Sequence, residues 1–167
     1  MAPEVERGED HHVTIATQLD QTHHFILETF VERGYAPHYT EIARRFGVPP
    51  EDGKRLLHEL MKSGLPMWVY PGTDLIASFA PFSNLPTQYR VTVDGRPGWF
   101  GQCGFESLAL TWVFPGKAVQ IDSPCLDCGE PLRIVVRDGI IERQEPETIV
   151  GYVDIPIARW PNDWPFT

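Results

Sequence analysis

The chain starts with a polar stretch and then places hydrophobic residues at helical spacing. Residues 1–21 are mostly polar and acidic and show little periodicity, so we expect a flexible arm there. The pair His11 and His12 in this arm is typical of solvated histidines rather than of a metal site. From His23 onward, apolar residues recur three and four positions apart until Gly34. This spacing predicts a helix that ends at that glycine.

Two more helices and a hairpin are predicted before residue 80. Thr40 is the expected N-cap of a helix that ends before Gly47, and the next helix covers 51–63. Short strands over 67–70 and 75–79 follow, joined by the turn at 71–74. Helices followed by a hairpin are typical of a winged helix, so we predict a winged-helix-like lobe over residues 22–80.

The pattern changes to strands after residue 80. Pro81, Ser83, Asn84 and Pro86 are typical of a linker. Beyond it, strands are predicted around Tyr89 to Val93, at 118–121, at 132–136, from Ile140 and over 149–155. One helix, over about 104–114, is embedded among them. Residues 81–167 are therefore predicted to form a mostly antiparallel sheet core, and the fold class is α+β.

Composition excludes several classes of protein. The 167 residues are 42% hydrophobic and 22% charged, which fits a globular chain with a real core. The formal charge of −9 and a predicted third helix whose acidic and basic residues balance disfavour nucleic acid as a partner. No apolar stretch approaches the ~20 residues of a membrane span. The acidic start is unlike a signal peptide, so we expect a cytoplasmic protein without a disulfide framework.

Cys103 and Glu106 are the first candidate site residues. If Cys103 begins the embedded helix, both lie on the same side of its first turn, and an apolar face is predicted to be buried, formed by Phe105, Leu108, Ala109 and Trp112. The helix N-terminus would lower the pKa of the thiol, and apolar surroundings would raise the pKa of the carboxyl group. Taken alone, the two residues fit an inert buried cysteine and a helix-stabilising glutamate better.

Cys125 and Cys128 form a Cys-x-x-Cys motif followed by Gly129. The motif resembles half of a zinc knuckle, but a structural zinc site needs four ligands and no second pair exists. Cys103 would supply a third metal ligand only if the fold brings it close. Zinc binding, a redox pair and a plain turn with buried thiols all remain open, and the plain turn is favoured.

Taken together, these residues resemble the alkylmercury (organomercurial) lyase family. The likeness rests on Cys103-Gly104-Phe105-Glu106-Ser107-Leu108, which is similar to the family's Cys-x-x-Asp-x-Leu, and on Phe114-Pro115 and the segment from Ser123 to Leu132. It covers roughly residues 40–136. In addition, Asn162-Asp163-Trp164 resembles the acidic-Trp sequence at the end of family members. The sheet core of 81–167 is thus identified as alkylmercury-lyase-like.

The resemblance implies an enzyme that cleaves a carbon–mercury bond by protonolysis, using two cysteines and an aspartate. Cys103 matches the first catalytic cysteine, and Glu106 stands where the family has its proton-donating aspartate. The second catalytic cysteine is missing, because its region falls near 147–154 and no cysteine follows Cys128. Either Cys125 or Cys128 supplies the second thiolate, or this family member has lost or exchanged the lyase activity.

Three functions are compatible with these residues. The first is an organomercurial lyase-like enzyme that requires no cofactor. Its substrate is an organometallic compound that supplies the mercury, and it works with external thiols. The second is a non-catalytic protein that binds zinc, copper or mercury through Cys103, Cys125 and Cys128. The third is a winged-helix regulator, which the neutral helix disfavours. A homodimer is open in each case.

Overall fold

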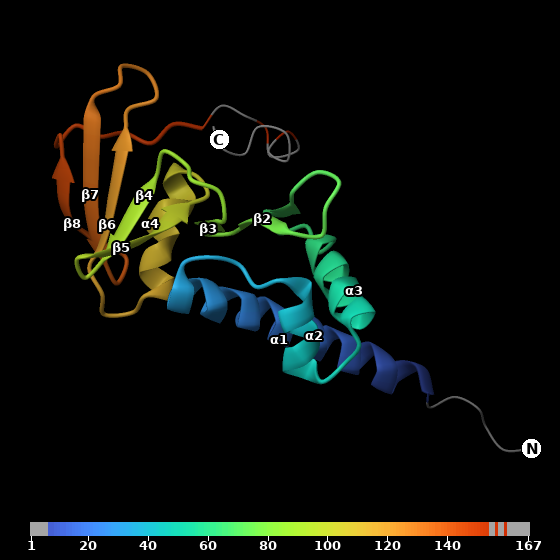
Figure 1. Ribbon diagram of the computed structural model, residues 1–167. Helices are drawn as coiled ribbons and strands as arrows, with labels where there is room; N and C mark the ends of the chain where they lie inside the picture. The colour runs from blue at the N-terminus through green and yellow to red at the C-terminus, as the bar shows by residue number, and fades with distance from the viewer. Residues whose placement is uncertain (1–6, 154–155, 157–158, 160–167) are drawn as a thin grey trace, which may run out of the picture.

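The helical half of the molecule contains three helices. A computed structural model describes residues 7–153, 156 and 159. Its first three elements are α1 (Arg7–Arg33), α2 (Tyr39–Phe46) and α3 (Pro50–Met61). Helices α2 and α3 pack together, and α1 runs from the N-terminal end of the molecule toward α4 (Figure 1). The expected arm over 1–21 is wrong from Arg7 onward, because residues 7–21 are the first part of α1. No glycine or proline interrupts residues 9–33, so polar composition alone does not stop the helix.

The start of α2 is fixed by a capping box. His38, not the predicted Thr40, is the N-cap: its ring accepts the backbone N–H of Thr40, and the Glu41 carboxylate accepts the N–H of His38 at 2.8 Å. Both guanidinium NH2 groups of Arg33 also donate to Glu41 at 2.9 Å. The end of α1 and the start of α2 are thereby tied together. The helix stops at Gly47, whose φ of 65° is left-handed.

All strands of the described chain belong to one antiparallel sheet of eight strands. Its spatial order is β1-β2-β3-β5-β4-β6-β7-β8. The strands are β1 (Met67–Val69), β2 (Ile76–Phe79), β3 (Phe82–Ser83), β4 (Arg90–Val93), β5 (Arg96–Gly101), β6 (Val119–Pro124), β7 (Pro131–Arg137) and β8 (Ile140–Glu145). The α+β class and the antiparallel sheet are confirmed. Three helices and then the β1–β2 hairpin follow in the predicted order, while the winged-helix assignment stays a prediction.

The segment expected to be a linker is a buried strand. The two residues of β3 pair with β2 on one side and with β5 on the other, which joins the hairpin to the rest of the sheet. Phe82 is fully buried and stacks on Phe30 of α1 with ring centroids 4.8 Å apart. The prolines and polar residues near this segment suggested exposure, but a single aromatic side chain anchors it in the core.

The core is shared by the two halves of the molecule. One cluster of buried side chains extends from the helices to the sheet, for example from Ile26 to Val136. The indole N–H of Trp99 on β5 donates to the carbonyl of Phe30 at 2.6 Å, across 69 positions of sequence. None of the described helices is long and apolar enough to cross a membrane.

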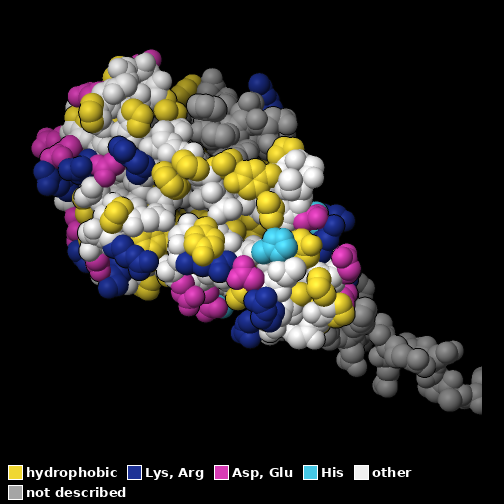
Figure 2. All heavy atoms as spheres, in the orientation of Figure 1, with side chains coloured by type: hydrophobic (Ala, Val, Ile, Leu, Met, Phe, Trp, Pro, Cys, Tyr) yellow, Lys and Arg dark blue, Asp and Glu magenta, His cyan; other side chains and the backbone are white. Residues whose placement is uncertain are grey.

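Helix α4 (Gly104–Val113) packs on the sheet with the face opposite to the one predicted. Its buried residues are Ser107, Leu110 and Thr111. Of the face expected to be buried, Phe105 is 50% exposed and Trp112 is 74% exposed, whereas Leu108 and Ala109 are partly buried. Figure 2 shows further hydrophobic side chains at the surface among charged ones. Ser107 is the residue at which α4 approaches β5 most closely, over Gly101.

Candidate functional site

Cys103 lies at the bend between β5 and α4. It is the N-cap of α4, with extended backbone angles, and its Sγ accepts the backbone N–H of Glu106 at 3.5 Å. Cys103 was predicted at this helix entry and Glu106 in its first turn, and both positions are found in the structure. The thiol therefore faces the N–H groups that begin the helix.

The residue before Cys103 is anchored to residues in and around the β1–β2 hairpin. Gln102 is 2% exposed, and its side-chain amide donates to Ser78 Oγ at 2.7 Å and to the carbonyl of Pro66 at 2.9 Å. Its backbone N–H donates to the carbonyl of Pro81 at 3.0 Å. These bonds fix the bend on which Cys103 stands.

Close packing behind Cys103 requires a glycine. A Cβ atom built on Gly101 would lie 1.9 Å from Ser107 Oγ and 2.9 Å from Ser107 Cβ, which is closer than atoms can approach. The Ser107 hydroxyl donates to the carbonyl of Cys103 at 2.6 Å. Gly101 thus lets α4 approach β5 closely enough for this bond to hold the N-cap residue.

The thiol of Cys103 is well shielded. The residue is 4% exposed, and burial raises the pKa of Cys103 above its usual value, while the N–H of Glu106 opposes the rise. The expected lowering by the helix N-terminus is wrong in sign, because the desolvation of a buried thiolate outweighs that one bond. At neutral pH the group is a thiol.

The carboxyl group of Glu106 is half-buried beside Cys103. Burial raises the pKa of Glu106, in the direction that the sequence predicted. A proton is therefore held on this carboxyl group to a higher pH than on a solvated one. The first turn of α4 therefore places a shielded thiol next to a carboxyl group whose pKa is raised by burial.

Tyr89 is part of this site, although sequence reasoning did not single it out. Burial raises the pKa of Tyr89, and the charge of a Cys103 thiolate would raise it further. Its hydroxyl hydrogen-bonds with the backbone of Gly104 and lies 3.5 Å from the place of a Cβ on that glycine. The sequence showed Tyr89 only as one residue of an alternating strand, which does not distinguish it from its neighbours.

Cys125 and Cys128 lie elsewhere, in the turn between β6 and β7. Cys125 is half-buried and Cys128 is exposed. Within the described residues, which include all three cysteines, no group of three His, Cys, Asp or Glu side chains is placed to hold a metal ion. The metal site expected from Cys103, Cys125 and Cys128 together is therefore not formed, because the fold places Cys103 at the start of α4 and the other two thiols at the end of a hairpin.

The segment after β8 passes close to α4. A Cβ on Gly151 would lie 2.8 Å from Cζ of Phe105, so this backbone lies against the ring next to the first turn of α4. The resemblance placed the missing second cysteine in this region, near 147–154. The strand predicted over 149–155 is absent from 149–153, and residues 154–155 lie outside the described residues.

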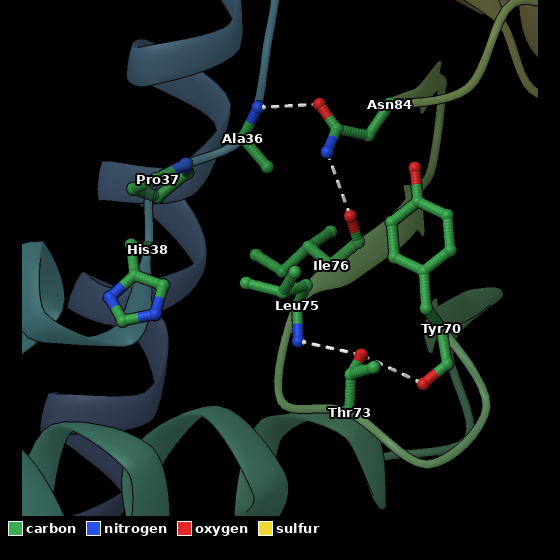
Figure 3. A pocket seen from close by; sticks show the side chains of 8 residues that line it. All are labelled: Ala36, Pro37, His38, Tyr70, Thr73, Leu75, Ile76 and Asn84. Carbon is green, nitrogen blue, oxygen red and sulfur yellow. Dashed lines mark hydrogen bonds between the residues drawn. The ribbon is translucent and has the colours of Figure 1, made fainter.

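A separate hollow of about 510 Å³ lies in the helical half. Ala36, Pro37 and His38 form one wall and the β1–β2 hairpin forms another (Figure 3). Asn84 closes it by accepting the N–H of Ala36 at 3.0 Å and by donating to the carbonyl of Ile76 at 2.9 Å. No thiol lines this hollow, so it is not part of the Cys103 site.

Comparison with known proteins covers the part of the chain that contains α4. The family model described as alkylmercury lyase matches residues 82–164, which include Cys103 and Glu106. The chain belongs to the alkylmercury lyase family. The family resemblance drawn from the sequence is thereby confirmed.

Individual relatives of this family member match over limited lengths. Alkylmercury lyases of Bacillus cereus and Clostridium butyricum are each 36% identical over 75 residues, which is 43% of this chain and 32% of theirs. The chain thus matches about a third of the length of these relatives. The mercury-bound form of MerB2 shares the fold, with a TM-score of 0.57 and 20% identity over 79% of this chain and 69% of that one.

Proposed function

We propose that this family member binds an organomercurial through Cys103 and cleaves its carbon–mercury bond with Glu106 as the proton donor. The observation that carries the proposal is the first turn of α4. There a shielded thiol accepts the backbone N–H of Glu106 at 3.5 Å, and the pKa of the Glu106 carboxyl group is raised by burial. A soft sulfur ligand and a proton source are the two parts that protonolysis needs.

Binding begins with ligand exchange at the mercury. The mercury of R–Hg–X forms a bond to Cys103 Sγ, the thiol proton leaves, and X departs as an anion. A raised thiol pKa does not prevent this step, because the soft metal displaces the proton directly. The shielded position of Cys103 keeps water away from the complex that forms.

Cleavage then transfers the proton of Glu106 to carbon. The electron pair of the carbon–mercury bond forms the new carbon–hydrogen bond, R–H leaves, and mercury remains Hg(II) without a change of oxidation state. Glu106 regains its proton from solvent. Because Cys125 and Cys128 do not join Cys103 in the described structure, the second sulfur ligand that draws mercury off the carbon comes from an external thiol.

The test is hydrocarbon release from an arylmercury compound by purified protein with excess small thiol. We expect Cys103→Ser to abolish release, and Glu106→Gln to slow it about 10²-fold or more while stoichiometric binding of the arylmercury compound persists. The double variant Cys125→Ser/Cys128→Ser is the matched control and should keep the activity. Release no faster than in a protein-free thiol solution would refute the proposal.

A further inference from the structure

The turn between β6 and β7 holds two thiols in a closed loop. The N–H of Cys125 donates to the carbonyl of Glu130 at 2.8 Å, and the N–H of Gly129 donates back to the carbonyl of Cys125 at 2.9 Å. Gly129 has a left-handed φ of 77°, which this tight return of the backbone requires. The strands below the loop stay paired up to Pro124 and Pro131. The loop is therefore a defined structure rather than a loose connection.

The two thiols in this loop point toward each other. The backbone N–H groups of Cys128 and Asp127 hydrogen-bond to the sulfur of Cys125, and the Cys128 thiol bonds to it as well. Together these bonds lower the pKa of Cys125, so its thiolate forms more readily than that of an ordinary cysteine. Cys128 is exposed, so an ion in solution reaches the pair directly.

The donor set selects the kind of ion. No third His, Cys, Asp or Glu of the described chain joins the two sulfurs. Structural zinc needs four ligands, and hard cations need several oxygens. Soft cations prefer thiolates. A site with two sulfurs and no more therefore favours an ion that is satisfied by two thiolates.

We propose that Cys125 and Cys128 form a second metal site, separate from Cys103, that chelates one soft cation such as Hg(II). Binding of one Hg(II) forms two sulfur–mercury bonds and releases both thiol protons to solvent, with no change of oxidation state. The site does not depend on carbon–mercury cleavage, so it stands or fails independently of the function proposed for Cys103.

The experiment uses the Cys103→Ser protein, which keeps only these two cysteines, after reduction with a phosphine. Mercuric chloride is added stepwise, while ultraviolet absorption of mercury–thiolate bonds and the remaining free thiols are measured. We expect both thiols to be consumed at one Hg(II) per chain. Under competition by a monothiol, we expect retention at least about tenfold stronger than in Cys103→Ser/Cys128→Ser, because chelation makes the second bond intramolecular.

Two results would overturn the proposal. One is equal retention of mercury by the two variants, which would show that the sulfurs act singly. The other is a ratio of one metal per two chains, with a matching shift in size-exclusion chromatography when either mercuric or zinc chloride is added. That result would assign the loop to a four-sulfur site between two copies. Circular dichroism of both variants checks that the exposed loop tolerates the substitutions.

Discussion

Replacing Gly101 by alanine tests whether close packing holds Cys103 in place. The added Cβ would lie 1.9 Å from Ser107 Oγ, 2.9 Å from Ser107 Cβ and 3.2 Å from Ser107 Cα. Ser107 is fully buried, so its side chain has nowhere to move without shifting α4. Overpacking of this kind costs about 2 to 3 kcal/mol of the free energy of unfolding. We expect Gly101→Ala to lose about that much.

A compensating variant separates the clash from other effects of the alanine. Ser107→Gly alone removes the hydroxyl bond and places glycine in a helix, which together cost about 2 kcal/mol. In Gly101→Ala/Ser107→Gly the nearest two of the three clashing atoms are gone. The double variant should therefore be more stable than the sum of the single effects predicts, by about 1.5 kcal/mol or more.

Urea unfolding followed by tryptophan fluorescence measures these free energies. Gly98→Ala is the matched control, because Gly98 lies on the same strand and a Cβ there meets nothing within 4 Å. It should change the free energy of unfolding by less than about 0.5 kcal/mol. If Gly101→Ala were equally mild, or if the two substitutions were additive, close packing would not be what holds Cys103.

Three further predictions concern stability. The Arg33 guanidinium lowers the pKa of Glu41 from 4.5 to about 2, so the stability that this pair contributes is lost as pH falls from 4.5 to 2. In urea titrations, Glu41→Gln should lower the free energy of unfolding by about 1 kcal/mol at neutral pH and by less at acid pH. Trp99→Phe should lower the free energy of unfolding by about 2 kcal/mol, because the hydrogen bond to the carbonyl of Phe30 is lost. Calorimetry that finds no loss of stability would contradict this. Burial raises the pKa of Glu106 above 4.5, so the folded protein loses stability as pH rises above that value. The free energy of unfolding of Glu106→Gln should therefore rise relative to that of the wild type as pH increases over this range. A difference between the two free energies that does not change with pH would contradict this.

Local signals predicted most of the elements correctly. Helical spacing and terminal glycines located the C-terminal ends of α1 and α2, where Gly34 has a φ of 84° and Gly47 of 65°. Cys103 was expected at the entry of α4, and it is the N-cap of that helix. In each case the deciding interaction lies within a few residues along the chain.

Errors arose where distant residues decide the structure. In α4 nearly every position is apolar or small, so periodicity does not identify the face that packs on the sheet. The close approach of Ser107 to Gly101 determines which face of α4 packs on the sheet. The pKa direction of Cys103 depended on how deeply the folded chain buries it, which no spacing reveals. Tyr89 was missed for the same reason.

The two-residue strand β3 limits how this protein can be divided. The region that matches the family model begins at Phe82, the first residue of this strand. A fragment cut there would lose the hairpin partner of β3 and uncover the Phe82 ring, leaving an unpaired strand edge and an aromatic group in water. The half that carries Cys103 thus depends on the helical half for its solubility, and gene fragments or fusions designed around the family boundary would yield aggregates.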